Sequence, residues 1–463
     1  MSLTLLLLLL FHVTDTYKIL VVIPKLAYSH MNFMGKIADV LVDAGHDVVT
    51  LQPVLAPVPS NGTKKSRLIQ VDADQKMIAP MLANFQKDHD TKWSDDATNP
   101  MQFYRVVPMI QEYARACVRT LLNDVQVLEE LKSENFDVGI TELFDFSGFP
   151  VFEAIGLKNI IGAHSISSLM EGTAYAVGVP VISSYMPASQ GITDDSTSIS
   201  TRVKNIIYTY LSFHFQNSAA RAAEEIMFEK LGKSATPIWD TVSNMTWLLT
   251  NAEPLFEFAK PTLNKIVDIG GIGVDKPKPL EKDWDRILSL RPRTILISFG
   301  SVLRGVNMPE LYKQSVMNLV KSDLDTTFIW KYEEPENAAF ADGVDNLILS
   351  KWTPQTDILA DDRLTLFITH GGAGSLFESA TYGKPLIVVP LFGDQIRNAR
   401  LVEKFGFGMM LDKSNLDNVD ALRLAVETFL GNKKYIAAAH RIRDILAKRP
   451  FSPEEKLDES STL

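Results

Sequence analysis

The sequence predicts an α/β protein made of two doubly wound domains, each built on a parallel sheet. Short runs of branched apolar residues, typical of buried strands, alternate with stretches of helical apolar spacing. Several runs stop at a glycine turn or a polar cluster that leads into a helix. The pattern starts at residue 17 and again at residue 294, after a segment rich in Pro, Lys and Asp. We therefore expect two α/β units joined by a linker.

Composition limits the protein class. The 463 residues carry 46 Lys and Arg against 56 Asp and Glu, a net charge of −10. This balance argues against nucleic acid as a partner. Cys117 is the only cysteine, so an intramolecular disulfide is impossible. Cys117 lies in a helical pattern, where we expect a small buried apolar residue rather than a reactive thiol.

The N-terminus begins with a leucine-rich run followed by polar residues. The run is too short to span a bilayer, so residues 1–16 are predicted to be a signal peptide. Two glycosylation sequons, at Asn61 and Asn244, agree with a secretory route. No later stretch reaches the roughly 18 apolar residues of a membrane-spanning helix, and none is expected.

The first domain is predicted to span residues 17–272. A strand at 17–23 leads into a loop that carries His30, followed by a helix at 33–44 and a second strand at 47–51. His30 therefore follows the carboxyl end of the first strand, where α/β sheets bind ligands. His46 starts a strand at the opposite end and is interpreted as structural.

The rest of this domain is less regular. Residues 53–99 and 177–200 are predicted to be loop-rich, the first with a helix or two. The further predicted helices are 101–131, 147–155 and 201–230, and the further predicted strands are 136–141, 159–163, 247–250 and 266–272.

Glu142 ends the strand at 136–141 and so lies at the same sheet edge as His30. A carboxylate there can orient an imidazole and stabilise its protonated form, as general base catalysis requires. The alternative is a loop carboxylate that faces water.

The second domain is predicted at residues 293–449, after a linker at 273–292 and before a polar tail at 450–463. Its predicted strands are 294–298, 326–330, 346–349, 364–369 and 386–389, and its predicted helices are 309–321, 376–382, 416–430 and 433–448. The glycine turn at 370–375 joins a buried strand to a helix, which places unpaired N–H groups where phosphates bind. The alternative is a connector without a ligand.

Residues around this turn suit the parts of a nucleotide sugar. The indole of Trp352 can stack on a base, and Gln355 can pair with a uracil edge. Glu378 can accept from ribose hydroxyls, and Asp394 with Gln395 can bind sugar hydroxyls. His370 and the turn's N–H groups fit a diphosphate. Taken singly, Trp352 could belong to the core and the polar residues could be solvated loop groups.

The segments ISFGS, WTPQTDIL and FITHGGAGSLFESATYGKPLIVVPLFGDQIRNA resemble the donor signature of the UDP-glycosyltransferases, and most closely the animal UDP-glucuronosyltransferase branch. The resemblance covers nearly the whole chain. It implies the GT-B fold, in which two Rossmann-like domains face a central cleft, with the acceptor in the first domain and the UDP-sugar in the second. It also implies inversion at the sugar, no cofactor and no metal.

The resemblance assigns a role to each matched residue. His30 matches the catalytic base, and Glu142 stands where relatives usually have an aspartate, one methylene shorter. Gly374 stands where many relatives have a polar residue. The implied donor-binding residues are Ser301, Thr369, His370, Gly371, Gly372 and Ser375 on the phosphate side, Trp352, Gln355 and Glu378 on the uridine side, Asp394 and Gln395 on the sugar side, and Lys331, which is often arginine in relatives.

The end of the chain departs from the family pattern. Relatives usually continue into a membrane-spanning helix, whereas residues 454–463 are polar. We therefore expect a shortened closing helix, no membrane anchor, and a location in the lumen of the endoplasmic reticulum. Homo- or hetero-oligomers remain open.

The expected function is transfer of a hexosyl group, glucuronate or glucose, from a UDP-sugar to a small lipophilic acceptor. One alternative is a non-catalytic, UDP-sugar-binding partner of full-length relatives, suggested by Glu142 and the chain end. A nucleotide-sugar epimerase is a third option, but it leaves His30 without a task.

Overall fold

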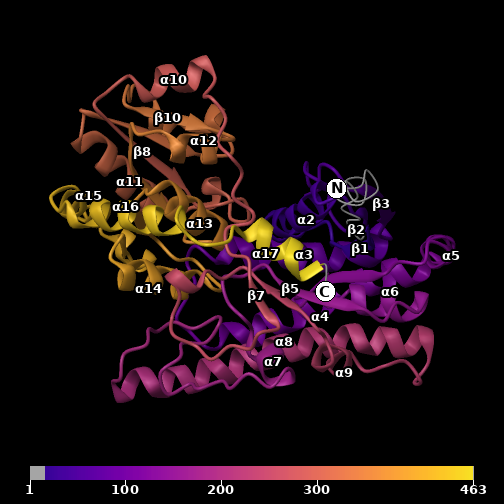
Figure 1. Cartoon of the computed structure of the whole chain (residues 1–463). Coiled ribbons are helices and arrows are strands. Elements are labelled where there is room, and N and C mark those ends of the chain that lie inside the picture. The colour runs from indigo at the N-terminus through magenta and orange to yellow at the C-terminus, as the bar shows by residue number, and fades with distance from the viewer. Residues whose placement is uncertain (1–15, 462–463) are drawn as a thin grey trace, which may run out of the picture.

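The computed structural model describes residues 16–461 and shows two parallel-sheet α/β domains (Figure 1), which confirms the predicted fold class. The predicted signal peptide lies outside the described residues except for Thr16. Within the described part of the chain, no helix is both long and apolar enough to cross a membrane. Cys117 is fully buried, as expected.

The first domain has a seven-stranded sheet in the order β3-β2-β1-β4-β5-β6-β7, with every neighbouring pair parallel. Its strands are β1 (Lys18–Val22), β2 (Asp47–Val54), β3 (Arg67–Asp72), β4 (Val138–Glu142), β5 (Ile160–His164), β6 (Leu248–Thr250) and β7 (Ile266–Asp268). The chain winds one way from β1 to β2 and the other way from β1 to β4. The crevice at such a switch point lies beyond the carboxyl ends of β1 and β4.

Helices cover both faces of this sheet (Figure 1). They are α2 (Tyr28–Asp43), α3 (Gln75–Thr91), α4 (Gln102–Asn123), α5 (Val125–Ser133), α6 (Gly148–Ile155), α7 (Glu171–Ala176), α8 (Ile199–Leu231) and α9 (Ile238–Ser243). We predicted that His30 lies in a loop. Helix α2 instead begins at Tyr28, so His30 lies in its first turn. The predicted helix at 101–131 is two helices, because Asp124 leaves helical geometry and caps α5 through Val127 N.

The second domain has a six-stranded parallel sheet in the order β10-β9-β8-β11-β12-β13. Its strands are β8 (Arg293–Ser298), β9 (Thr326–Lys331), β10 (Leu347–Ser350), β11 (Leu364–Thr369), β12 (Leu386–Val388) and β13 (Gly408–Met410). Its helices are α11 (Glu310–Ser322), α12 (Gln355–Ala360), α13 (Ala373–Tyr382), α14 (Gln395–Phe405), α15 (Ala421–Leu430) and α16 (Lys434–Leu446). The switch point here lies between β8 and β11, where Ser298 is opposite Thr369.

Several elements differ from the sequence expectation. Strands β3 and β13 and helices α7, α9, α12 and α14 were not predicted. The predicted strand at 266–272 is shorter, since Gly270 and Gly271 end it in turns. The segment predicted as a linker contains the short helix α10 (Lys282–Leu288).

The predicted polar tail forms helix α17 (Pro453–Ser461), which packs on α2 and β7 of the first domain. Figure 1 shows α17 running from the second domain across to the first. Leu457 is 1% exposed and belongs to the apolar core around β1 and α2, and Lys456 Nζ donates to Asp268 O at 3.1 Å. The chain therefore returns to the first domain, and the shortened closing helix stays a prediction.

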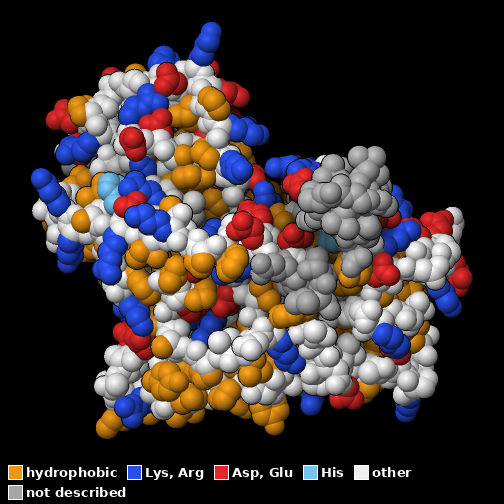
Figure 2. Space-filling model, in the orientation of Figure 1, with side chains coloured by type: hydrophobic (Ala, Val, Ile, Leu, Met, Phe, Trp, Pro, Cys, Tyr) orange, Lys and Arg blue, Asp and Glu red, His pale blue; other side chains and the backbone are white. Residues whose placement is uncertain are grey.

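Trp93 joins the two domains at their interface. It comes from the segment between α3 and α4, is 1% exposed and belongs to the apolar core of the second domain. A separate apolar surface lies on α8, where Ile199, Val203, Ile206 and Tyr210 are exposed. Figure 2 shows hydrophobic side chains along the lower edge of the molecule, where α8 lies in Figure 1.

Candidate active site

The two switch points face each other across the domain interface. Tyr28, at the start of α2, contacts the ring of Trp352 in the second domain edge-on, with centroids 6.0 Å apart. Ser167, which follows β5, donates from Oγ to Asn398 Oδ1 of α14. The negative charge of Asp394 in the second domain also acts on His30. The residues predicted to act on acceptor and donor are therefore gathered at one place.

On the first-domain side, His30 and Glu142 are in direct contact. Nδ1 of His30 lies 2.7 Å from Oε1 of Glu142. The Glu142 side chain is 3% exposed and that of His30 is 22% exposed. With the Nδ1 proton donated to the carboxylate, Nε2 of His30 is the ring nitrogen with a free lone pair. The arrangement can orient the imidazole and accept a proton at Nε2.

Ser165 completes this group and was missed by the sequence analysis. Its Oγ donates to Glu142 Oε1 and lies 2.9 Å from His30 Nδ1. Its backbone N–H also donates to Glu142 Oε1 at 3.4 Å. Ser165 directly follows β5, at the same sheet edge as His30, so the strand-end rule applied to β5 would have found it.

Opposing effects set the protonation of the pair. Burial lowers the pKa of His30, but the charge and hydrogen bond of Glu142 outweigh it, so the pKa is raised above its usual value. Burial raises the pKa of Glu142, but His30 and the Ser165 hydrogen bond lower it overall. The imidazolium form of His30 is therefore stabilised by an ionised Glu142.

Asp145 adds a second buried carboxyl near this pair. Burial and, second, the charge of Glu142 raise the pKa of Asp145 to about 7. Its Oδ1 accepts from the N–H of Ser147 at 2.8 Å. Since Glu142 is the carboxylate in contact with His30, Asp145 is a neighbour of the pair and not its partner.

On the second-domain side, two glycine turns pack around the ring of His370. Gly300 and Gly371 have φ values of +84° and +83°, which disfavour a side chain. A Cβ on Gly300 or on Gly372 would lie 2.7 Å from ring atoms of His370, and one on Gly371 would lie 2.5 Å from Cγ1 of Val388. The glycines thus allow the close approach of the β8 and β11 turns.

The turn after β11 presents the start of α13 without a side-chain cap. Gly372 is the N-cap residue and offers no side-chain acceptor to the first-turn N–H groups. Those N–H groups and the helix dipole favour an anion. Burial and, second, the charge of Lys331 lower the pKa of His370 to about 4, so its ring is neutral at pH 7. Neighbouring Ser301 is exposed and Thr369 is fully buried, with Oγ1 3.3 Å from His370 Nδ1.

Trp352 is exposed rather than part of the core. The side chain is 60% exposed, and Lys331 Nζ lies 5.8 Å from the centre of the ring. Lys331 is held by the Gly300 carbonyl, to which Nζ donates at 2.7 Å. An exposed indole supported by a fixed cation can stack on a flat base.

Glu378 lies one turn into α13 and binds two residues of α12. Thr356 Oγ1 donates to Glu378 Oε1 at 2.5 Å, and Gln355 Nε2 donates to Oε2. Gln355 Nε2 also donates to Ser375 Oγ at 3.2 Å. Because each carboxylate oxygen has two acceptor sites, Glu378 retains capacity for further donors. Thr356 is a further member that the sequence analysis missed.

Asp394 and Gln395 differ in how much of their side chain remains available. Gln395 is 4% exposed, and its Oε1 already accepts from Leu391 N and Phe392 N. Gln395 Oε1 thus holds the loop at residues 391–392, and the Nε2 group is the part of the side chain that can contact a ligand. Asp394 accepts from Asn398 Nδ2 at 3.0 Å, and Asn398 also donates to Gly371 O at 2.9 Å. Asn398 was not among the predicted site residues. It connects the start of α14 to the glycine turn through these two hydrogen bonds.

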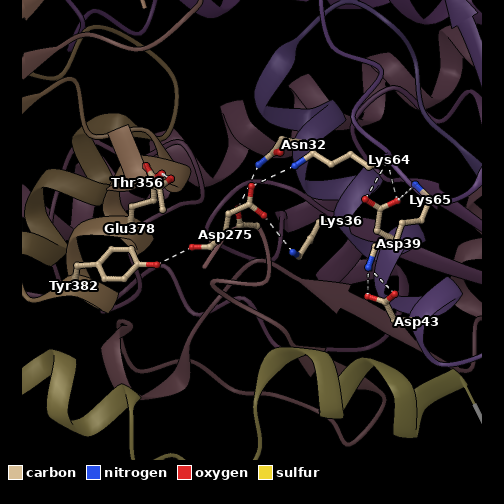
Figure 3. A network of polar contacts seen from close by, with 11 residues as sticks. Asn32, Lys36, Asp39, Asp43, Lys64, Lys65, Asp275, Thr356, Glu378 and Tyr382 are labelled. Carbon is tan, nitrogen blue, oxygen red and sulfur yellow. Dashed lines mark hydrogen bonds and ion pairs between the residues drawn. The ribbon is translucent and has the colours of Figure 1, made fainter. Parts of the chain in front are cut away.

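Asp275, in the segment between the domains, links them beside this site. Lys36 and Lys64 contact its carboxylate at 3.3 and 3.4 Å, and Tyr382 of α13 donates to its carbonyl at 2.7 Å. Figure 3 shows Asp275 between the two lysines on one side and Tyr382 on the other. The first domain, the linker and α13 are thereby connected.

The two sequons lie in different surroundings. Asn244 is exposed, with Nδ2 donating to Asp240 O. Asn61 is partly buried, and its Oδ1 accepts from Lys25 Nζ and Gln70 Nε2. Asn244 is the more accessible candidate for glycosylation.

Comparison with known proteins gives a match along nearly the whole chain. The family model described as UDP-glucoronosyl and UDP-glucosyl transferase matches residues 18–458. The putative UDP-glucuronosyltransferase ugt-48 of Caenorhabditis elegans is 28% identical over 457 residues, covering 96% of this chain and 85% of that protein. The UDP-glucuronosyltransferase 3A2 of Homo sapiens is 28% identical over 440 residues, covering 93% and 81%.

Solved structures show a similar fold. The glycotransferase of kitacinnamycin superposes with a TM-score of 0.67 at 16% identity, covering 96% of this chain and 99% of that one. The spinosyn rhamnosyltransferase SpnG, complexed with thymidine diphosphate, has a TM-score of 0.63 at 15% identity, covering 96% and 100%. At these identities the likeness concerns the arrangement of the two domains.

Proposed function

Since this chain belongs to the UDP-glucoronosyl and UDP-glucosyl transferase family, and is thus a glycosyltransferase, we propose the details of its reaction. The sugar is a hexosyl group, glucuronate first and glucose second, carried by UDP. The acceptor is a hydroxyl group of a small lipophilic molecule. The observation that carries the proposal is the contact of His30 Nδ1 with Glu142 at 2.7 Å, which leaves Nε2 of His30 to act as the base.

The reaction proceeds by one displacement. Nε2 of His30 takes the proton from the acceptor hydroxyl as its oxygen forms a bond to the anomeric carbon of the sugar. The bond from that carbon to the diphosphate oxygen breaks, and UDP leaves with the electron pair, so the sugar is inverted. Glu142 stabilises the resulting imidazolium, and Ser165 holds Glu142 in place.

The second domain binds the donor. Trp352 stacks on the uracil, Gln355 and Glu378 bind the uridine, and the N–H groups at the start of α13 bind the diphosphate. These groups stabilise the negative charge that grows on the leaving diphosphate. The phosphate side also includes Ser301, Thr369, His370, Gly371, Gly372 and Ser375, with Lys331 beside it. Asp394 and Gln395 bind the sugar hydroxyls. No metal or cofactor has a part in this scheme.

The non-catalytic alternative loses part of its motivation. It rested on Glu142 in place of an aspartate and on the chain end. Glu142 contacts His30 at hydrogen-bond distance, and α17 packs on the first domain. Both observations favour transfer. The signal-like residues 1–16 and the exposed Asn244 support a location in the secretory pathway, with the lumen of the endoplasmic reticulum as our proposal.

The test compares the wild-type protein with His30→Ala and with His440→Ala, whose histidine is exposed on α16. Transfer from radiolabelled UDP-glucuronate and UDP-glucose is measured with a panel of phenols and steroids, and UDP affinity by calorimetry. We expect His30→Ala to lose transfer by a factor of about 10²–10⁴, the scale of a general base. UDP affinity should stay unchanged, and His440→Ala should match the wild type. A folded wild-type protein that binds UDP but transfers neither sugar would favour the non-catalytic role.

A further inference from the structure

A cavity lies at the domain interface, and none of the residues assigned to the reaction lines it. It is small, with about 40 Å³ available to the centre of a water-sized sphere. Its walls come from the residues after β5, from α7, from residues 179–189 and from residues 258–261, and Arg397 of α14 closes it from the second domain. Most of the lining is apolar, including Leu169, Val179, Met186 and Phe258.

Arg397 brings a buried positive charge to this cavity. The residue is 3% exposed, and its Nη2 donates to Glu257 Oε1 at 2.6 Å. Its guanidinium also lies 5.2 Å from the centre of the Phe258 ring. Nε and Nη1 are buried and have no hydrogen-bond partner among the described residues. Unsatisfied buried donors on a cation are costly, so a ligand acceptor at this place is favoured.

Lys260 adds a second cation from the first domain. Its Nζ lies 3.6 Å from Glu257 Oε2, which makes an ion pair but no hydrogen bond. Nζ is buried, and in the described part of the chain nothing accepts a hydrogen bond from it. Ser168, another lining residue, likewise has a buried Oγ without a hydrogen-bond partner in that part. Donors from three lining residues are thus left over.

The acceptors at and beside the cavity do not match these donors. Glu257, which lies next to the lining residue Phe258 in the chain, is one carboxylate shared by two cations. Glu171 lines the cavity, but its oxygens accept from the N–H and the Oγ of Ser189, both at 2.6 Å. Burial, moreover, raises the pKa of Glu171. Lys260 and Arg397 thus share the single carboxylate of Glu257, and the Glu171 carboxyl is bound to Ser189, so donors of both cations remain unpaired beside an apolar wall.

We propose that this cavity binds the carboxylate of a small amphipathic organic anion, held by Lys260, Arg397 and Ser168. Arg offers paired N–H donors to a carboxylate, and Lys adds a point charge. The apolar part of the ligand lies against Val179, Met186 and Phe258. Because Lys260 and Arg397 belong to different domains, the bound carboxylate connects the domains. This binding does not depend on the transfer reaction.

The anion has two possible sources with the same chemistry. Ser168 follows Ser165 closely in the chain, and Arg397 follows Asp394, so the cavity and the cleft share their supporting segments. An acidic acceptor molecule can place its carboxylate here while its hydroxyl reaches His30. Alternatively, an organic acid that is not a substrate occupies the cavity alone.

The test uses hexanoate as the probe and hexanol as its neutral counterpart, with binding to the whole chain measured by calorimetry without donor. We expect hexanoate to bind at least tenfold tighter than hexanol. Lys260→Met should remove most of that difference, and Lys260→Arg should keep it. Lys404→Met is the matched control, since Lys404 lies 4.8 Å from the same Phe258 ring but pairs with Asp195 and does not line the cavity.

Thermal unfolding of each variant shows that it is folded before binding is compared. Equal affinity for hexanoate and hexanol, or an unchanged preference in folded Lys260→Met, overturns the proposal. Transfer to a neutral phenol then separates the sources. Competitive inhibition by hexanoate with respect to the phenol supports a carboxylate site for acceptors, and the absence of competition supports a separate anion site. A chain that transfers no sugar can still pass the binding test, so the two proposals fail separately.

Discussion

Glu142 Oε1 lies 2.7 Å from Nδ1 of His30, although the two residues are 112 positions apart. The contact follows from the sheet, because β1 and β4 are parallel neighbours at the switch point, Glu142 ends β4, and His30 lies in the first turn of the helix that follows β1. The resemblance leads one to expect an aspartate at position 142. In this chain the longer glutamate reaches the imidazole, and Ser165 fixes the same carboxylate oxygen.

Glu142→Gln should lower transfer and move its pH dependence. Glu142 raises the pKa of His30, while burial alone would lower it. The base must be neutral, so activity rises with pH through the pKa of His30, which lies above the usual value. Without the carboxylate this pKa falls, and the acidic limb of kcat/KM should shift to lower pH. The plateau rate should also drop, because the imidazolium loses its partner. A pH profile of transfer measures both effects.

Glu142→Asp serves as the control that keeps the charge. Shortening the side chain by one methylene withdraws the carboxylate from Nδ1, and misplacement by about 1 Å can cost up to roughly 10²-fold in rate. We expect a transfer rate between those of the wild type and Glu142→Gln, with UDP affinity unchanged. If the acidic limb of kcat/KM in Glu142→Gln stays at the same pH as in the wild type, the proposed pairing of Glu142 with His30 is wrong.

Trp352→Ala should weaken UDP binding by about 1–3 kcal/mol, the scale of one base–aromatic stack. Because Trp352 is 60% exposed, its removal should leave the melting temperature nearly unchanged. Trp352→Phe, which keeps a ring, should lose less affinity. Calorimetric titration with UDP gives the constants. Unaltered affinity in the alanine variant would exclude the stacking role.

Gly371→Ala and Gly374→Ala form a matched pair in one turn. A Cβ at Gly371 would meet Val388 Cγ1 at 2.5 Å and would occupy a backbone with φ of +83°, so the turn must distort. At Gly374, inside α13, a Cβ meets nothing within 4 Å. We expect Gly371→Ala to lose UDP binding and stability. Gly374→Ala should keep binding and gain about 0.5–1 kcal/mol, as Ala favours a helix over Gly. Equal effects would show that the turn conformation is unimportant.

The sequence predicted the strands that form the centre of each sheet, because buried parallel strands are continuous apolar runs. The same pattern located His30, Glu142 and the turn at 370–375, since each follows such a run. Edge elements were harder to detect. Strand β3 is mostly exposed or half-buried, and the buried face of α14 includes the polar residues Arg397 and Asn398 beside its apolar ones.

Contacts between the domains could not be predicted from local patterns. Ser167 and Asn398 form a hydrogen bond between the domains across 231 positions of the chain, and no periodicity marks such a pair. The cavity around Arg397 has the same origin, because its lining comes from segments of both domains. The packing of α17 could not be predicted either, because this polar segment has a single apolar residue, Leu457, that enters the first-domain core.

Trp93→Ala should destabilise the protein and weaken donor binding together. The indole is buried in the second-domain core, edge-on to Phe299 at 5.2 Å, and its Nε1 donates to Arg304 O at 3.2 Å. Phe299 precedes the turn at Gly300, so the loss of Trp93 loosens a wall of the phosphate side. Removing a buried tryptophan costs about 3–5 kcal/mol.

Thermal unfolding and UDP titration of Trp93→Ala check this, with Trp93→Phe as the variant that keeps an aromatic ring but loses the hydrogen bond. We expect the phenylalanine variant to keep most of the stability, because apolar packing outweighs one hydrogen bond of about 1 kcal/mol. If Trp93 served only the first domain, Trp93→Ala would lower the melting temperature and leave UDP affinity intact. A weaker UDP affinity, by contrast, requires that this residue of the acceptor-side domain supports the donor site directly.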